Sequence, residues 1–267
     1  MTQIQIYQID AFTAERFTGN PAAICPLESW LPDAVMQAIA AENNLAETAY
    51  FVAEGDSYRL RWFTPAVEVD LCGHATLASA HVLFRHLGHA GDTIRFETRS
   101  GTLNVTRDGE LLALDFPARP GTPVDLPAGV AEAMGKTPLE TYHAGGNFML
   151  VYANQADVAG LTPDFRALKQ IGAAQGDAGF IASAPGNESG IDFVSRYFAP
   201  AHGIDEDPVT GSTHCTLTPY WARRLGKAAL TARQISARGG TLHLTDRGAR
   251  IGIAGRAVDY LQGVITV

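Results

Sequence analysis

Two eleven-residue stretches decide the organisation of this chain: residues 99–109 are RSGTLNVTRDG and residues 238–248 are RGGTLHLTDRG, identical at six of eleven positions. Working outward, residues 61–66 (RWFTPA) match residues 196–201 (RYFAPA) at four of six positions. The order is kept, and the offset changes only from 135 to 139. Chance would match roughly one position in fifteen at ordinary composition. We therefore interpret the chain as an internal duplication.

Each half has the pattern of a sheet with one long helix. In the first half, residues 4–9 alternate as a strand does, and residues 31–42 place apolar side chains at helical spacing. Residues 73–87 predict a longer helix that ends at a glycine. The corresponding helices of the second half are expected at 163–171 and 212–225. Because strands dominate around these helices, we expect an α+β fold.

A proline-rich segment separates the two halves. Prolines stand at positions 117, 120, 123 and 127, and such clusters are typical of connections between structural units. We expect an N-terminal half at residues 1–117 and a C-terminal half at residues 118–267.

Composition narrows the classes of function. The chain has 267 residues, 20 Lys and Arg against 28 Asp and Glu, and a formal net charge of −8. With 46% hydrophobic and 18% charged residues it fits a compact protein and not a disordered one. The acidic balance argues against nucleic acid or an anionic membrane as partner.

The sequence has no pattern typical of a membrane-spanning, secreted or disulfide-rich protein. No apolar run reaches the roughly 18 residues that a membrane span needs, and the first residues lack the pattern of a signal peptide. Three scattered cysteines are too few for a disulfide framework or a zinc site. We expect a cytoplasmic protein without a membrane partner.

The two long helices begin with matching segments, residues 73–76 (GHAT) and residues 211–214 (GSTH). A glycine followed by small or hydroxyl residues leaves the backbone N–H groups of a helix start open to a ligand, and the helix dipole favours an anion there. If a pseudo-two-fold axis relates the halves, both helix starts face one cleft, which would bind a carboxylate. The alternative is two ordinary glycine-containing loops.

Three segments and one turn carry a family resemblance. Residues 44–48 (NLAET), 71–76 (LCGHAT) and 205–212 (DEDPVTGS), with the Gly19-Asn20-Pro21 turn, resemble the signature segments of the phenazine biosynthesis-like PhzF family. That family belongs to the diaminopimelate epimerase superfamily, and the resemblance covers essentially the whole chain.

The resemblance implies two pseudo-symmetric halves of diaminopimelate-epimerase-like fold. Each would be a curled, mostly antiparallel sheet around a central helix, with the active site in the cleft between them. It also implies isomerisation without a cofactor, and a homodimer.

Carried over position by position, the resemblance puts the family's general acid/base on Glu47. The other catalytic and substrate-binding groups fall on His74, Asp207, Ser212, Gly73, Gly211 and Asn20. Moving a proton between carbons of a small acid needs one base that removes and returns it, and a carboxylate does this at neutral pH if its environment is desolvated. Glu47 precedes the apolar run 49–52, which suits such burial. Without the resemblance, a given Glu is usually a solvated surface charge.

The other candidate catalytic residues also have simpler structural explanations. His74 could bind a substrate carboxylate or relay a proton, or could only bond the backbone at a helix start. Asp207, next to a proline, could hold Glu47 or the substrate, or could only stiffen a turn. Its neighbour Glu206 is the alternative for that role.

Cys72 raises the possibility of racemase chemistry. In the related epimerases and racemases two thiols face each other across the substrate, and the superfamily alignment puts Cys72 at the first thiol position. The second position falls on Thr210, whose hydroxyl is not a base at neutral pH. We therefore favour Cys72 as a small buried residue, while a version in which Cys72 and Glu47 act as opposed bases stays open.

No motif indicates a metal or a cofactor. Cys72-x-His74 and His214-Cys215 lack a zinc spacing, and no GxGxxG follows a strand. The leading hypothesis is a cofactor-independent isomerase that shifts a proton within a small anionic metabolite, a carboxylic acid, through Glu47. The alternatives are an epimerase or racemase that uses Cys72 with a second base, and a non-catalytic protein that binds a small acid.

Overall fold

The computed structural model describes residues 2–267, and the chain divides into two compact units. Unit 1 runs to Asp115 and also contains Ala254–Val267, whereas unit 2 is Phe116–Ile253. Residues 254–267 therefore belong to unit 1, whereas the boundary expected from the sequence assigned them to the C-terminal half. The reason is β18 (Ala257–Thr266), which pairs antiparallel with β1 (Gln3–Ala11) along its length, from Gln3 opposite Thr266 to Ala11 opposite Ala257.

Unit 1 consists of mostly antiparallel strands and two helices. In chain order these are β1 (Gln3–Ala11), β2 (Asn20–Leu27), α1 (Asp33–Asn43), β3 (Glu47–Glu54), β4 (Ser57–Phe63), β5 (Glu68–Val69), α2 (Gly73–Arg85), β6 (Thr93–Thr98), β7 (Gly101–Asp108) and β8 (Leu111–Pro117), whose last two residues belong to unit 2, followed by β18. Strands β2 and β3 are parallel, as are β4 and β6. The pairs β1–β18, β1–β2, β3–β4, β4–β5, β6–β7 and β7–β8 are antiparallel.

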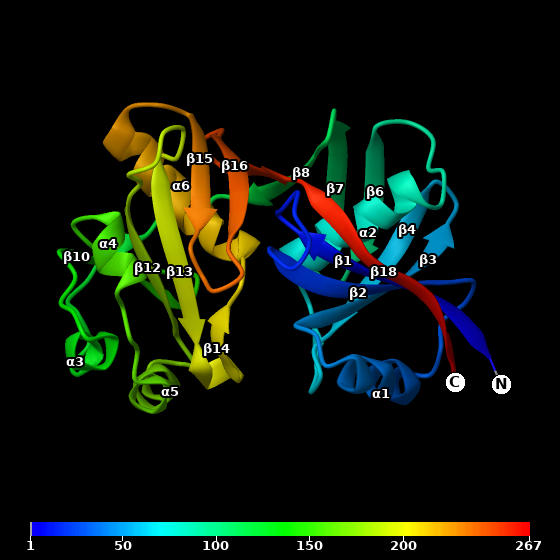
Figure 1. Ribbon diagram of the computed structural model, residues 1–267, viewed down its shortest axis with the longest axis horizontal. Helices are drawn as coiled ribbons and strands as arrows, with labels where there is room; N and C mark the ends of the chain where they lie inside the picture. The colour runs from blue at the N-terminus through cyan, green and yellow to red at the C-terminus, as the bar shows by residue number, and fades with distance from the viewer. Residues whose placement is uncertain (1) are drawn as a thin grey trace. The chain divides into compact units, whose positions relative to one another are not determined.

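Helix α2 is the central element of unit 1. It is buried on nearly all sides from His74 to Leu83, and it contacts β1, β2, β3, β7 and β18 (Figure 1). Small residues such as Ala75, Ala78 and Ala80 leave room for the strands to approach. A helix with buried side chains all round belongs in a core, as the sequence predicts for this segment.

A second layer lies on the other side of the sheet. Helix α1 packs Met36 and Ile39 against side chains from the strands, including Cys25, Tyr50 and Phe63. The buried Tyr50 hydroxyl donates a hydrogen bond to the Met36 carbonyl at 2.8 Å, as a buried tyrosine requires.

Unit 2 repeats this plan. Its elements are β9 (Thr122–Pro123), α3 (Val130–Met134), β10 (Glu140–Ala144), β11 (Asn147–Val151), α4 (Gln155–Ala159), α5 (Phe165–Ala174), β12 (Gly179–Pro185), β13 (Phe193–Ala199), η1 (Pro200–His202), β14 (Ile204–Asp207), α6 (Gly211–Leu225), β15 (Ala229–Gln234), β16 (Gly240–Asp246) and β17 (Arg250–Gly255), which continues into unit 1. Helix α6 is the buried central helix and contacts β15 and β16.

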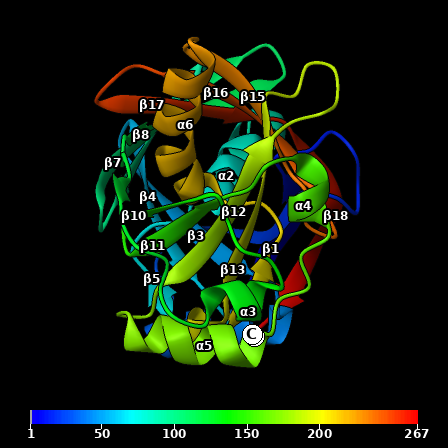
Figure 2. The same cartoon turned by 90° about the vertical axis from the view of Figure 1, so that its left-hand side faces the viewer.

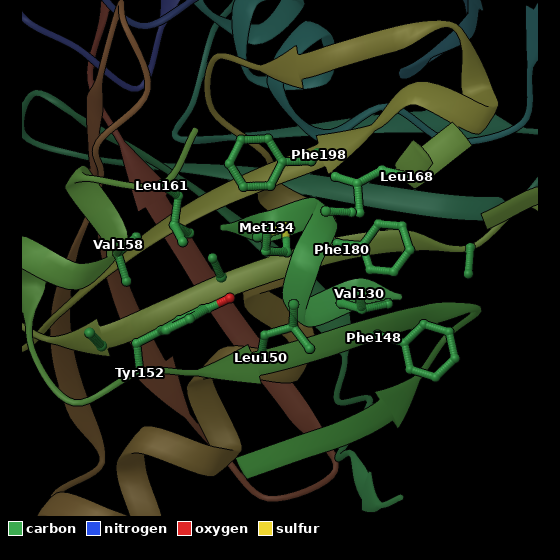
Figure 3. Packing of buried hydrophobic residues seen from close by; sticks show 14 of the residues in the cluster. Val130, Met134, Phe148, Leu150, Tyr152, Val158, Leu161, Leu168, Phe180 and Phe198 are labelled. Carbon is green, nitrogen blue, oxygen red and sulfur yellow. The ribbon is translucent and has the colours of Figure 1, made fainter. Parts of the chain in front are cut away.

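The outer layer of unit 2 is larger than that of unit 1. Figure 2 shows α3 and α5 side by side, and the two helices are in contact. Figure 3 shows how their apolar side chains pack on those of the sheet, with Met134 and Leu168 from the helices near Phe180 and Phe198 from the strands. Burying each such side chain contributes roughly 1.5–3 kcal/mol.

Three successive strand pairings of unit 1 have counterparts in unit 2. Strands β2 and β3 are parallel, as are β11 and β12. The hairpins β3–β4 and β12–β13 are antiparallel, and parallel pairings then follow, β4 with β6 and β13 with β15. This is the repeated topology that an internal duplication predicts. The protein is thus α+β, and none of the described helices is long and apolar enough to cross a lipid bilayer.

Candidate active site

Glu47 is the first residue of β3. Helix α1 ends just before it, because Asn44 takes a left-handed conformation (φ 49°, ψ 35°) and turns the chain. Asn43 donates a side-chain hydrogen bond to Thr48 Oγ1 at 3.1 Å, which fixes the entry into the strand. The side chain of Glu47 is only 13% exposed, so the burial expected from the sequence is observed.

His74 faces this carboxylate from the first turn of α2. Its Nε2 lies 3.0 Å from Glu47 Oε2, and its own side chain is 7% exposed. Both atoms are buried, yet neither makes a well-aligned hydrogen bond within the described part of the chain. Buried polar atoms are almost always satisfied, so this pair has unused capacity to donate and to accept.

Cys72 completes the cluster in unit 1. It is the extended residue (φ −143°) that precedes α2, and its Sγ lies 3.5 Å from His74 Nδ1. Burial, and then the negative charge of Glu47, raise the pKa of Cys72 to about 11. Both causes disfavour the thiolate form of Cys72.

The charge state of His74 follows from its two neighbours. Burial opposes a charged ring, but Cys72 and Glu47 beside its two nitrogens together raise the pKa of His74 well above its ordinary value. An imidazolium next to a buried carboxylate is the form this favours at neutral pH. Such a pair offers one proton donor and one proton acceptor at a single point.

The remaining predicted groups of unit 1 lie at two chain turns. Asn20 is fully buried as the first residue of β2. Gly19 before it has φ +69°, and a Cβ there would lie 2.3 Å from the Ala11 carbonyl oxygen, so only glycine fits. Gly73 opens α2, and no side chain from the described residues caps that helix start. The use of its first backbone N–H groups by a ligand stays a prediction.

The corresponding corner of unit 2 holds Asp207, Thr210 and Gly211. Thr210 is the extended residue (φ −114°) before α6, again without a side-chain cap among the residues described. Its hydroxyl donates a short hydrogen bond to Asp207 Oδ2. Ser212 is exposed in the first turn of the helix.

Gln234, which no sequence pattern singles out, connects the residues of this corner by hydrogen bonds. It is fully buried; its Oε1 accepts from Thr210 N at 2.9 Å, and its Nε2 donates to the Asp207 carbonyl at 2.8 Å and to Thr210 Oγ1 at 3.2 Å. No repeat or motif marks this glutamine, because its role depends on contacts with residues about 25 positions away.

A duplicated arginine supports each corner. Arg61 forms a two-pronged ion pair with Glu68 at 2.7 and 2.8 Å, and Arg196 forms the same pair with Glu206 at 2.7 and 2.9 Å. These arginines are the first residues of the RWFTPA and RYFAPA repeats, so the sequence did carry a signal for them. Glu206 is occupied by Arg196 and is therefore a poorer candidate than Asp207 for the role both were considered for.

Two clusters of the described residues have metal-ligand chemistry. One is Glu47, Cys72 and His74; the other is His81, His86 and Asp259. Neither follows a recognised zinc spacing in the sequence, and the expectation of a metal-free protein stays a prediction.

Comparison with known proteins assigns the family. Residues 9–263 match the family described as phenazine biosynthesis-like protein. An uncharacterized isomerase of Pseudomonas aeruginosa is 48% identical, with 98% of this chain and 99% of that protein covered. The chain therefore belongs to the phenazine biosynthesis-like, or PhzF, family.

Solved structures agree on the fold. A PhzF-family protein of Enterococcus faecalis superposes with a TM-score of 0.95 at 45% identity, over all of both chains. A hydroxyproline epimerase of Agrobacterium vitis superposes with a TM-score of 0.62 at 11% identity, over 98% of this chain and 92% of the other. The second likeness concerns the fold alone, and it agrees with the expected epimerase-like architecture.

Proposed function

We propose that this protein is an isomerase that moves a proton between carbons of a small carboxylic acid, without a cofactor, with Glu47 as the general acid/base. The observation that carries the proposal is the buried pair of Glu47 Oε2 and His74 Nε2, 3.0 Å apart and without aligned partners. The names of relatives as isomerases support the reaction class.

The reaction balances with these two groups. The Glu47 carboxylate takes a proton from a carbon next to an electron-withdrawing group, and the electron pair of that C–H bond enters the substrate as an enolate-type system. The His74 imidazolium donates a hydrogen bond to the oxygen on which negative charge develops. Protonated Glu47 then returns the proton to a second carbon, which restores the enzyme.

The second corner enters the proposal through the family resemblance. We assign Asp207, Gly211, Ser212 and the open start of α6 to binding of an anionic or polar group of the substrate, together with Gly73 and Asn20. The support is that α6, like α2, begins without a side-chain cap, as far as the described residues go. The homodimer and the cytoplasmic location stay predictions.

The racemase alternative is less well supported. A Cys base must be a thiolate, but the pKa of Cys72 is about 11. The other thiol position is Thr210, whose hydroxyl already donates to Asp207. The alternative of a non-catalytic binding protein would leave the unaligned Glu47–His74 pair without a purpose.

Deuterium exchange tests the proposal directly. The protein, dialysed against EDTA, is incubated in D₂O with a panel of small carboxylic and amino acids, and incorporation is followed by mass spectrometry. We expect the wild type to label at least one acid and Glu47→Gln to label it about 10³-fold more slowly, within the range that general acid–base groups contribute.

The matched control is Glu54→Gln, at the opposite end of the same strand, where the side chain is 45% exposed. This variant should label at the wild-type rate. Deuterium incorporation by Glu47→Gln at the wild-type rate would refute the assignment of Glu47 as the base. Tight binding of an acid that the wild type never labels would instead favour the binding protein.

A further inference from the structure

Unit 1 contains a cavity that the proposed reaction does not use. It has a volume of about 580 Å³ and is lined by side chains from separate segments of the chain. Four of them are arginines, and we call this set the arginine pocket: Arg16, Arg85, Arg107 and Arg256. They come from the β1–β2 loop, the end of α2, β7 and the residue before β18.

The arginine pocket is separate from the Glu47–His74 pair. His74 and Arg85 lie on the same helix, eleven residues apart, at its first turn and its last residue. At 1.5 Å per residue this corresponds to about 17 Å. A ligand in the pocket would therefore not occupy the proposed reaction site.

The charge of the pocket contrasts with the charge of the chain. Its lining carries four arginines against two carboxylates, those of Glu110 and Asp259, a formal balance of 4 − 2 = +2. The whole chain has a formal net charge of −8. His81 also lines the pocket, and burial holds its pKa below the ordinary value in spite of Asp259. Positive charge is thus concentrated here in an acidic protein.

Two of the arginines are held in place by neighbours. Arg107 lies over the ring of Phe84 at 4.6 Å and pairs with Asp92 at 3.0 Å. Arg85 Nε lies 3.0 Å from Asp259 Oδ2. A guanidinium whose direction is already fixed loses less entropy when it binds an anion.

The other two arginines have capacity for a ligand. Arg16 donates through Nε to the Asp259 carbonyl at 2.8 Å, and within the described residues no carboxylate pairs with it. Arg256 pairs with Glu110 at 3.0 Å, but Glu110 is 79% exposed and can turn into solvent. Both guanidinium groups can therefore offer two parallel N–H donors to an oxyanion.

A metal ion is the competing occupant, because His81, His86 and Asp259 are a possible ligand set. Asp259 Oδ1 already accepts from both rings, at 3.1 and 2.8 Å, and its Oδ2 is bound by Arg85. Arg85 and Arg16 both donate to Asp259, so their positive charges would repel a divalent cation there. The same surroundings attract an anion.

We propose that the arginine pocket binds a small multivalent oxyanion, either phosphorylated or polycarboxylate, at a site distinct from the Glu47–His74 pair. The side chains of Phe84, Leu112 and Val258 add an apolar part to the lining, which suits a ligand whose charged groups are attached to a carbon skeleton. The proposal does not depend on the proposed isomerase activity.

Isothermal titration calorimetry on the full chain tests this, with EDTA present and ionic strength held constant. Pyrophosphate and citrate are the probes, and acetate is the monovalent comparison. We expect one of the two probes to bind at least tenfold more tightly than acetate, and the preferred probe identifies phosphate or carboxylate groups as the chemistry. Equally weak binding of all three would overturn the proposal.

Variants separate the pocket from general charge attraction. Arg16→Ala and Arg256→Ala should each weaken binding of the preferred probe about tenfold. Arg16→Lys, which keeps the charge but not the planar fork, should weaken it less. Arg59→Ala, another exposed arginine of unit 1 that lies outside the pocket, should leave binding unchanged. An equal loss in Arg59→Ala would show non-specific attraction and contradict the proposal.

Discussion

The two corners that precede α2 and α6 share a scaffold but not their chemistry. In both, an arginine–glutamate ion pair supports a short strand, an extended residue follows, and a glycine opens a buried helix. Unit 1 adds the Glu47–His74 pair to this scaffold. Unit 2 adds instead a hydrogen-bonded network of Asp207, Thr210 and Gln234.

The strand register identifies the position of unit 2 that corresponds to Glu47. Arg61 lies opposite Tyr50, three residues after Glu47, and Arg196 lies opposite Ala182, three residues after position 179. The counterpart of Glu47 is therefore Gly179, which has no side chain. The duplicated scaffold is kept in both units, whereas the proton-transfer groups occur in one, and this is the difference that we expect experiments to expose.

The largest effect should come from breaking the shared scaffold. Replacing Arg196 by Met leaves Glu206, 18% exposed, without its partner. Replacing Arg61 by Met leaves Glu68, 13% exposed, still paired with Arg99 at 2.7 Å. We expect Arg196→Met to lower the free energy of unfolding by about 3 to 4 kcal/mol, because removing one member of a largely buried ion pair leaves the other uncompensated. Arg61→Met should cost less, because Arg99 still compensates Glu68. Chemical denaturation measures this.

The same substitution in a solvated ion pair is the control. Arg233 and Glu188 are 2.7 Å apart but 47% and 45% exposed, so Arg233→Met should cost less than about 1 kcal/mol. Adding Glu206→Gln to Arg196→Met should recover much of the loss. A cost of Arg196→Met no larger than that of Arg233→Met would contradict the role of this ion pair in the scaffold.

The histidines of the two helices should respond to pH in opposite directions. Burial lowers the pKa of His214 to about 4, so the unfolded chain takes up this proton first, near pH 6.5. Its contribution to stability is complete above that pH and is lost as the pH falls towards 4, by about 3 kcal/mol. His74 has a raised pKa, so its contribution is present at low pH and is lost as the pH rises through that raised value.

Denaturation of the wild type and of His214→Gln between pH 7 and pH 4 isolates this effect from that of the carboxylates. His214→Gln should lose less stability over this range than the wild type. An equal loss in the two proteins would contradict the prediction that His214 is buried in its neutral form. His74→Gln should not reduce the acid sensitivity.

Much of the scaffold could be predicted from the sequence, because duplication and helical periodicity are local patterns. The long helices expected at 73–87 and 212–225 are α2 and α6 within two residues at each end. The small helices α3 and α4 were not predicted, since five residues are too few for periodicity to register. The C-terminal strand could not be assigned to unit 1, because its partner β1 lies more than 240 residues away.

For the site, residue types could be predicted from the sequence, but their hydrogen-bond and ion-pair partners could not. The resemblance brought Glu47 and His74 together, and they do lie in contact. A Gly-Asn pair occurs in both units, as Gly19-Asn20 and as Gly146-Asn147. The second pair is displaced by two residues from the position that corresponds to the first, because the register sets Asn147 opposite Gly179 and Ala22 opposite Glu47. Only strand pairing reveals this offset, since the loops of the two units differ in length.

A smaller effect is expected at Gly179 itself. A Cβ there would lie 2.5 Å from the Tyr197 hydroxyl and 2.7 Å from Asn147 Oδ1. Gly179→Ala should therefore cost about 2 kcal/mol of unfolding free energy, as overpacking of a filled site does. The cost should shrink in a Tyr197→Leu background, which a double-mutant cycle measures. Equal costs in both backgrounds would mean that Tyr197 is not what excludes a side chain from the position that Glu47 fills in unit 1.

The smallest effect is expected at the extended residues before the two helices. Cys72 and Thr210 occupy the same position in the two corners, and in neither is the side chain a base at neutral pH: burial raises the pKa of Cys72 to about 11, and the Thr210 hydroxyl donates to Asp207. Cys72→Ser keeps the size and changes the sulfur to oxygen. We expect deuterium exchange to fall by less than tenfold, about 1.4 kcal/mol, because Cys72 affects the reaction only through the neighbouring His74 ring. A loss as large as that of Glu47→Gln would make Cys72 a second base, and the two units would then differ by an opposed pair of bases rather than by one carboxylate and one imidazolium.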